Sequence, residues 1–207
     1  MNSSTIDDWL DSLAAKQPTP GGGAVAALAA AMSAAQLNMV TAYTTGPKWQ
    51  DREKRMKELS RSLSDLRVQA LDIAKQDAEA FAKLSAAYKI PASGDSQKSQ
   101  RGSAIQQALT EAAVPPTKTA QLAGKLVAIS EELVESGNPN VVSDVAVGAS
   151  LARAALESAI VNIEINAKDI RDSKVKSSLK QEVEDAVDFI QDVDVIVESV
   201  RDKLGSK

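Results

Sequence analysis

The sequence predicts an all-α protein: a single-domain, antiparallel helical bundle of about seven helices with long central helices. Apolar and small residues recur at steps of three and four along most of the 207 residues, which is the spacing of one helix face. Hydrophobic residues make up 43% of the chain but aromatic residues only 3%, so aliphatic and small side chains must fill the core. One core can organise this length, and we expect one domain over residues 1–207.

Two helices are predicted around a glycine-rich segment near the amino terminus. Ser4 begins a short amphipathic helix that ends before Pro18 and carries an apolar stripe of Ile6, Trp9, Leu10 and Leu13. The second helix covers residues 24–43 and is rich in alanine. Its length would suit a membrane span, but polar side chains interrupt it at Ser33, Gln36, Asn38 and Thr41. We therefore expect a buried central helix and no membrane partner.

A long third helix follows. Apolar and small residues keep helical spacing from residue 50 to residue 88, and Pro91 ends the pattern. Residues 92–101 are rich in Ser, Gln and Gly, a composition that predicts a mobile loop.

The next two helices are separated by a pair of prolines. A fourth helix is predicted over residues 103–114, and Pro115 and Pro116 should end it, because proline has no N–H to continue the hydrogen-bond ladder. A fifth helix then restarts at the prolines and runs to Ser136, with Gly137 as its left-handed cap.

Two further helices complete the predicted bundle. Residues 138–140 form a turn, and Ser143 begins a sixth helix that reaches about Asp172. The last helix is predicted from an apolar stripe of Val183, Val187, Ile190, Val193, Val197, Val200 and Leu204.

Composition excludes several classes of function. A net charge of −4 and a pI near 5.0 give no basic surface for nucleic acid. The absence of cysteine and of a signal peptide pattern leads us to expect a cytoplasmic location. The absence of histidine excludes Ser-His-Asp triads, and we expect no metal and no cofactor. Acid–base chemistry must therefore use Asp, Glu, Lys or Tyr, or a base from substrate or water.

Asp77 is the first polar residue that breaks the apolar pattern. It lies four residues after Ile73 and three before Ala80 on the seam of the third helix. A carboxylate that is desolvated there would have a raised pKa, in the range useful for proton transfer. A structural role, in which Asp77 bonds a helix end or an arginine, explains the same position equally well.

The predicted sixth helix carries two more candidates. Steps of three and four from Asp144 lead to Asn162, so both lie on one helix face with small and apolar residues. Asp144 in a first turn favours the helix dipole, which is the commoner explanation of such an acid. Asn162 needs several hydrogen-bond partners if buried, and a structural network accounts for it as well as a ligand does.

Two segments could bind anionic or carbonyl groups. Gly21, Gly22 and Gly23 precede a buried helix, where exposed N–H groups beside a positive dipole end suit a carboxylate or the carbonyl oxygens of a flat heterocycle. A flexible turn is the simpler interpretation. Lys48 belongs to a basic cluster that is usually a solvated face but could receive an anionic tail.

Three segments together resemble the cyclodeaminase/cyclohydrolase family of tetrahydrofolate enzymes. The first runs from Pro18 through the glycines to Leu28, the second from Asp77 to Pro91, and the third from Gly137 to Asp144. Their order and spacing match that family over nearly the whole chain. Ala24 departs from the pattern, which often has Ser at this position.

The resemblance implies a homodimer of all-helical subunits that uses a folate substrate. It implies Asp77 and Asp144 as acid–base or pterin-binding groups, and a substrate-binding set of Pro20, Gly21, Gly22, Gly23, Lys48, Phe81, Asn138 and Asn162. The reaction would be either formiminotetrahydrofolate cyclodeamination or methenyltetrahydrofolate hydrolysis, and the sequence does not decide between them. The alternative is a non-catalytic helical ligand-binding or scaffold dimer.

Overall fold

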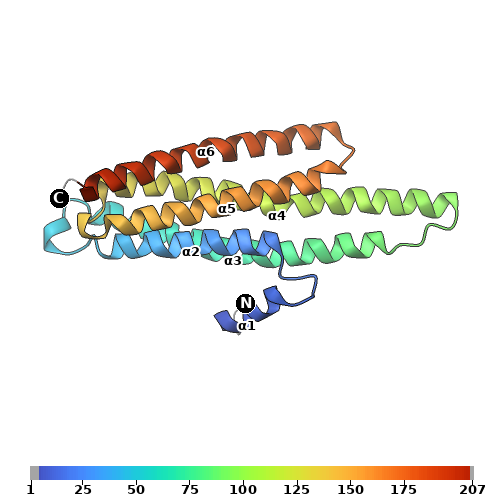
Figure 1. Cartoon of the computed structure of the whole chain (residues 1–207), viewed down its shortest axis with the longest axis horizontal. Coiled ribbons are helices and arrows are strands. Elements are labelled where there is room, and N and C mark those ends of the chain that lie inside the picture. Colours follow the sequence, from blue (N-terminus) through green and yellow to red (C-terminus); the bar gives the residue numbers. More distant parts are fainter. Residues whose placement is uncertain (1–4, 206–207) are drawn as a thin grey trace.

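The computed structural model describes residues 5–205, and these contain helices and no strand (Figure 1). The prediction of an all-α fold is confirmed. A short helix precedes five long ones, and two 3-10 turns join them. Their bounds are α1 Ile6–Ala14, α2 Gly22–Ala42, η1 Pro47–Trp49, α3 Glu53–Tyr88, α4 Asp95–Ser136, η2 Pro139–Val141, α5 Val142–Lys168 and α6 Ser173–Gly205.

Consecutive long helices run antiparallel. Arg55 near the start of α3 binds Glu132 near the end of α4, and Lys83 near the end of α3 binds Glu111. Figure 1 shows the same alternation from α2 to α6, and it shows α3 and α4 extending well beyond the start of α2. This difference in length leaves space beside the start of α2.

The helix count differs from the prediction because Pro115 and Pro116 lie inside one continuous helix, α4. Pro116 has no N–H for the carbonyl of Ala112, four residues earlier. The Nδ2 of Asn166 on α5 donates to that carbonyl at 3.1 Å. Both prolines are buried against neighbouring helices, so packing and a replacement hydrogen bond keep the helix intact.

Two local predictions were also wrong. The segment 92–101 is not a loop throughout, because α4 begins at Asp95. Gly137 ends α4 in an extended conformation with φ −75°, so it is not a left-handed cap. The backbone N–H of Gly137 instead donates to the carbonyl of Leu133 at 2.9 Å.

Small residues let α2 lie against its neighbours in the core. Seven of its alanines are buried, and a Cβ on Gly148 of α5 would lie 2.6 Å from Leu37. The helices α2 and η2–α5 are long and apolar enough to cross a membrane, a test that core helices of soluble proteins also pass. The bundle buries the inner faces of both helices.

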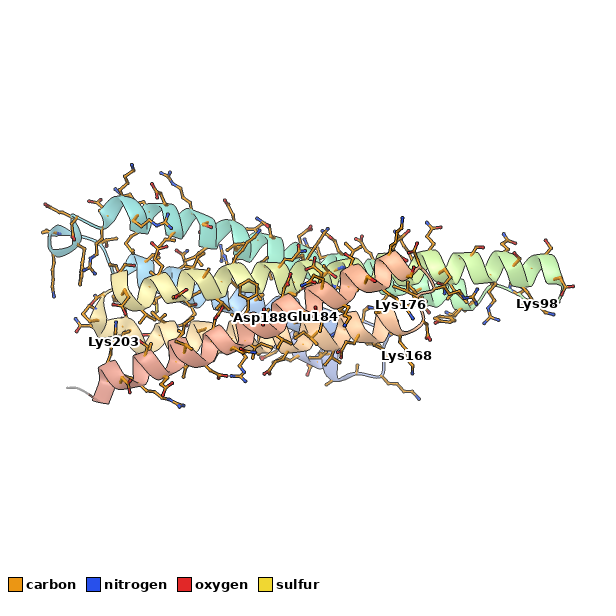
Figure 2. The ribbon with its side chains drawn as sticks, turned by 90° about the horizontal axis from the view of Figure 1, so that it is seen from above. Lys98, Lys168, Lys176, Glu184, Asp188 and Lys203 are labelled. Atoms are coloured by element: carbon orange, nitrogen blue, oxygen red, sulfur yellow. The ribbon has the colours of Figure 1, made fainter. Side chains whose placement is uncertain are left out.

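The helix α6 presents a charged face to the outside. Glu184 and Asp188 project from its middle, while Lys168 and Lys176 lie near the turn that joins it to α5 (Figure 2). Its inner face supplies Leu179, Ala186, Val193, Ile196 and Val200 to the core. This amphipathic pattern is that of a helix whose outer side is solvated.

Candidate functional site

A cavity of about 330 Å³ lies beside the first turn of α2. The loop before α2 closes one end, α3 and α5 form two walls, and α4 supplies the remaining surface. The lining residues are Pro18, Thr19, Gly21, Gly22, Gly23, Asp77, Phe81, Leu84, Tyr88, Leu109, Ala112, Asn162, Ile165, Asn166 and Asp169. Most predicted site residues from the first half of the chain are therefore brought together with one from the second half. We call this space the site cavity.

Asp77 joins α3 to the start of α2. Its carboxylate accepts the backbone N–H of Ala24, in the first turn of α2. The N-cap residue of that helix is Gly21, which has no side chain to do this. The structural role that the sequence left open for Asp77 is therefore present.

The same carboxylate faces the site cavity. Desolvation by the surrounding protein raises the pKa of Asp77, and the hydrogen bond from Ala24 opposes that shift without cancelling it. Asp77 thus has two of the properties expected of an acid–base residue, a position in a cavity and a raised pKa.

The glycines before and within α2 make this close approach possible. A Cβ on Gly23 would lie closer than 3.0 Å to the carboxylate of Asp77. A Cβ on Gly22 would lie 3.3 Å from the Nδ2 of Asn162. Two glycines at the start of one helix therefore allow α3 and α5 to bring a carboxylate and an amide against its backbone. Pro20 lies in the preceding loop but does not line the site cavity.

An apolar wall continues from Asp77 along α3. Phe81, Leu84 and Tyr88 follow it at steps of four, three and four, so the four side chains share one helix face. Phe81 and Tyr88 are 44% and 46% exposed, which leaves their rings open to the site cavity. The family resemblance implied Phe81 as a site residue but not Leu84 and Tyr88, which the helical spacing from Asp77 could have identified.

The opposite wall, on α5, is polar. Asn162 donates from Nδ2 to the carbonyl of Ser158 at 2.7 Å. Asn166 donates from Nδ2 to the carbonyls of Asn162 and Ala112 at 2.9 and 3.1 Å. Sequence reasoning found Asn162 but missed Asn166, which lies one turn further on the same face.

Three other predicted site residues lie near the far end of α2. Asp144 accepts a hydrogen bond from Gln36 at 2.7 Å, and Gln36 is 13 residues along α2 from Gly23. At 1.5 Å per residue this places Asp144 roughly 20 Å from Asp77. Within one chain, the two acids therefore do not share a site.

Asn138 and Lys48 lie beyond the end of α2. Asn138 donates from Nδ2 to the carbonyl of Tyr43 at 2.8 Å and accepts the N–H of Asn140, so it fixes the turn before α5. The Nζ of Lys48 lies 5.1 Å from the centre of the Trp49 ring. Neither residue lines the site cavity of its own chain.

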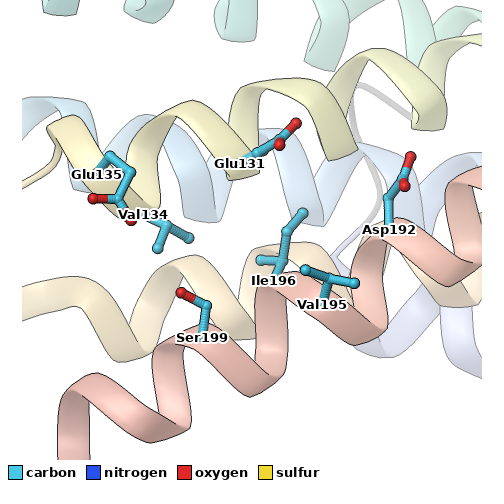
Figure 3. A pocket seen from close by; sticks show the side chains of 7 residues that line it. All are labelled: Glu131, Val134, Glu135, Asp192, Val195, Ile196 and Ser199. Carbon is cyan, nitrogen blue, oxygen red and sulfur yellow. The ribbon is translucent and has the colours of Figure 1, made fainter.

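A second hollow lies between α4 and α6 (Figure 3). Its floor is apolar and its rim carries Glu131, Glu135 and Asp192, but no predicted site residue lines it. Among residues 5–205, no group of three or more Asp, Glu, His or Cys side chains is placed to hold a metal ion. The site cavity is therefore the hollow that gathers the predicted residues.

Known proteins resemble the chain over most of its length. A methenyltetrahydrofolate cyclohydrolase from Methylorubrum extorquens is 35% identical over 181 residues, which is 87% of each chain. A formimidoyltransferase-cyclodeaminase from Rattus norvegicus is 31% identical over 170 residues, 82% of this chain and 31% of the rat protein.

A solved structure agrees with these relatives. The crystal structure of formiminotetrahydrofolate cyclodeaminase from Thermotoga maritima superposes with a TM-score of 0.84 and 30% identity, and the match covers 99% of this chain and 98% of that one. The profile of the formiminotransferase-cyclodeaminase family matches residues 5–185. The chain that forms this glycine-lined cavity therefore belongs to the formiminotransferase-cyclodeaminase family.

Proposed function

We propose that the protein is a folate one-carbon enzyme that acts on the bridge between N5 and N10 of tetrahydrofolate. Relatives named as a cyclodeaminase and as a cyclohydrolase match most of the chain, which supports either of the two reactions. The observation that carries the proposal is Asp77, a carboxyl group with a raised pKa, held against the first turn of α2 inside the site cavity.

Cyclodeamination needs a proton donor. N10 of the folate attacks the carbon of the N5-formimino group, and the resulting intermediate expels ammonia. The leaving amine must be protonated before the carbon–nitrogen bond breaks. A carboxyl group whose pKa is raised by desolvation retains its proton to a higher pH, so Asp77 suits this role.

Cyclohydrolysis places a different demand on the same group. Water attacks the carbon of the cationic methenyl bridge, and an ionised carboxylate can orient that water and stabilise the cation. Asp77 in its ionised form would do both. One pocket can thus support either reaction: cyclodeamination would use Asp77 in its protonated form, and cyclohydrolysis would use it in its ionised form.

The rest of the site cavity suits a flat, amino-substituted heterocycle. Phe81 and Tyr88 offer rings for stacking, and the volume of about 330 Å³ matches that of small-molecule sites. The first turn of α2, with Gly22 and Gly23, turns the positive end of a helix dipole toward ligand oxygens.

We also propose that the protein is a homodimer, and an apolar face formed by α2 and α5 supports this. The helix α2 contains no charged residue, yet Met32 is 47% exposed. On α5, Val161 and Ile165 are 62% and 61% exposed. The apolar face comprises Val25, Leu28, Met32, Ala35 and Met39 of α2 and Val147, Leu151, Ala154, Val161 and Ile165 of α5. Such a face favours a second copy as its cover.

A two-fold axis that crosses α2 near Met32 would place two copies of that helix antiparallel. The end of one α2, with Asp144 and Lys48 nearby, would then approach the start of the other, with Asp77. Each site would draw Asp77 from one subunit and Asp144 from its partner. Asp77 and Asp144, which lie roughly 20 Å apart along α2 in a single chain, would then lie in the same site.

Near-ultraviolet absorbance tests the proposed function. The methenyl compound absorbs in this range, whereas its formimino precursor and its hydrolysis product do not. Absorbance that grows from formiminotetrahydrofolate indicates cyclodeamination, and faster decay of added methenyltetrahydrofolate indicates hydrolysis. Both assays contain a chelator, because the proposal requires no metal. Rates equal to those without protein in both assays would reject the proposal.

A further inference from the structure

The amide of Asn166 is fixed by two carbonyl groups. Its Nδ2 donates to Ala112 of α4 at 3.1 Å and to Asn162 of its own helix at 2.9 Å. A primary amide has two N–H bonds, so this geometry uses both of them. The orientation follows from chemistry, because an amide oxygen in that place would oppose two carbonyl oxygens.

The proline pair of α4 explains why this amide is held. Pro116 cannot donate to the carbonyl of Ala112, which therefore lacks its usual partner in the helix. Asn166 supplies the missing donor from another helix. The hydrogen bond that is missing from the α4 ladder therefore explains why the Asn166 side chain is held in this position.

A second amide on the α5 wall has the same orientation, although only one of its two N–H bonds is used. Asn162 also turns its Nδ2 to a backbone carbonyl, that of Ser158. The Oδ1 atoms of Asn162 and Asn166 remain as hydrogen-bond acceptors on a wall of the site cavity. The facing wall carries the ring of Phe81. A flat ligand between the walls would stack on Phe81 and meet acceptors at its edge.

We propose that Asn166, together with Asn162, is a specificity-determining residue that accepts N–H groups from the amino-substituted edge of the pterin ring. The inference rests on the proposed function, because it assigns one edge of the folate to one wall of its site. It orients the ring with its amino edge toward α5 and its face against α3. Ligands that lack donors on this edge leave two fixed acceptors unpaired.

A comparison of two ligands tests the assignment. Calorimetry would measure the affinity of the intact protein for a stable tetrahydrofolate analogue and for the same analogue with methyl in place of the ring 2-amino group. We expect wild type to prefer the amino ligand by about tenfold, the value of one or two hydrogen bonds. In Asn166→Ala the preference should fall to about twofold or less. Because the ratio is taken within each protein, a general loss of affinity cancels.

The outcomes separate this inference from the proposed function. If Asn166→Ala binds both ligands with the wild-type preference, the inference is wrong and folate binding stands. If wild type binds neither ligand, both proposals fail. Should Asn166→Ala not fold, Asn162→Ala provides the same comparison, because its amide bonds only within α5. A control, Asn140→Ala in the turn before α5, should keep the wild-type preference.

Discussion

Asp77 accepts a hydrogen bond from the backbone N–H of Ala24, so a side chain of α3 caps the helix α2. A cap needs only an acceptor oxygen, whereas proton transfer needs a group that can gain and lose a proton. The two roles can therefore be separated by a substitution that keeps the oxygen and removes the proton.

Asp77→Asn is that substitution. The asparagine Oδ1 can still accept the N–H of Ala24, so we expect a folded protein that binds folate. The rate constant of the catalysed reaction should fall by about 10²–10⁴-fold, the usual contribution of a general acid or base. Absorbance assays at saturating substrate measure the rate. Asp65→Asn, at an exposed position of α3, is the matched control and should keep full activity. An unchanged catalysed rate in Asp77→Asn would show that Asp77 is not the acid–base group, whereas no catalysed rate in wild type would favour the scaffold alternative.

The stability of wild type and that of Asp77→Asn should depend differently on pH. The pKa of Asp77 is raised above its ordinary value of 3.8, so the folded state holds the proton more tightly than the unfolded state. The stabilising contribution of Asp77 is therefore complete below pH 3.8 and is lost as pH rises through the raised pKa. Asparagine does not titrate.

Relative to Asp77→Asn, wild type should therefore become less stable as pH rises from 4 toward 7. Urea unfolding at a series of pH values measures the difference in free energy of unfolding between the two proteins. A difference that stays constant with pH, or that changes in favour of wild type, would contradict the desolvation of Asp77.

Gly23→Ala should disturb the contact between α2 and α3. The new methyl group would lie closer than 3.0 Å to the carboxylate of Asp77, so that side chain or helix must move. We expect a loss of about 1–3 kcal/mol in the free energy of unfolding, together with reduced activity. Gly102→Ala is the control. Gly102 also lies in a helix, α4, but a methyl group at this position would contact nothing within 4 Å. It should stabilise the protein by about 0.5–1 kcal/mol.

Part of this site was predictable from the sequence because local patterns carry it. Asp77 breaks an apolar seam of regular spacing, and Gly22 and Gly23 stand at the start of an alanine-rich helix, so both features are unusual in the sequence. Their meeting depends on α2 and α3 lying antiparallel, which short connections favour. A carboxylate on the buried face of a helix, in a chain without histidine, is what makes Asp77 a candidate for acid–base chemistry.

The continuity of α4 could not be predicted in this way. Two adjacent prolines normally end a helix, and the sequence gives no local sign that they do not. The partner that stabilises the freed carbonyl of Ala112 is Asn166, 54 residues away on α5. Tertiary contacts of this kind override local propensity. The position of α5 along α2, where Gln36 binds Asp144, is another tertiary feature, and it separates Asp144 from Asp77.

Met32→Glu should weaken the proposed homodimer. Met32 lies in the middle of the apolar face, and a two-fold axis would place the two glutamates close together, where like charges repel. We expect a shift from dimer to monomer in analytical ultracentrifugation at micromolar concentration. Val195→Glu replaces an exposed apolar residue of α6 outside this face, and the dimer should persist. A monomeric wild type would contradict the proposed dimer, and binding of wild type to lipid vesicles would indicate a membrane as the cover instead.

Mixing two inactive variants tests whether each site draws on both subunits. Asp77→Asn and Asp144→Asn should each lose activity as pure proteins. A mixed dimer in the antiparallel arrangement contains one site with both substitutions and one site with neither. Random exchange makes half of the dimers mixed, so activity should return to about a quarter of wild type. The mixture stays inactive if each subunit needs its own Asp77 and Asp144. Recovered activity would therefore show that the roughly 20 Å between these acids along one α2 is bridged by the second subunit.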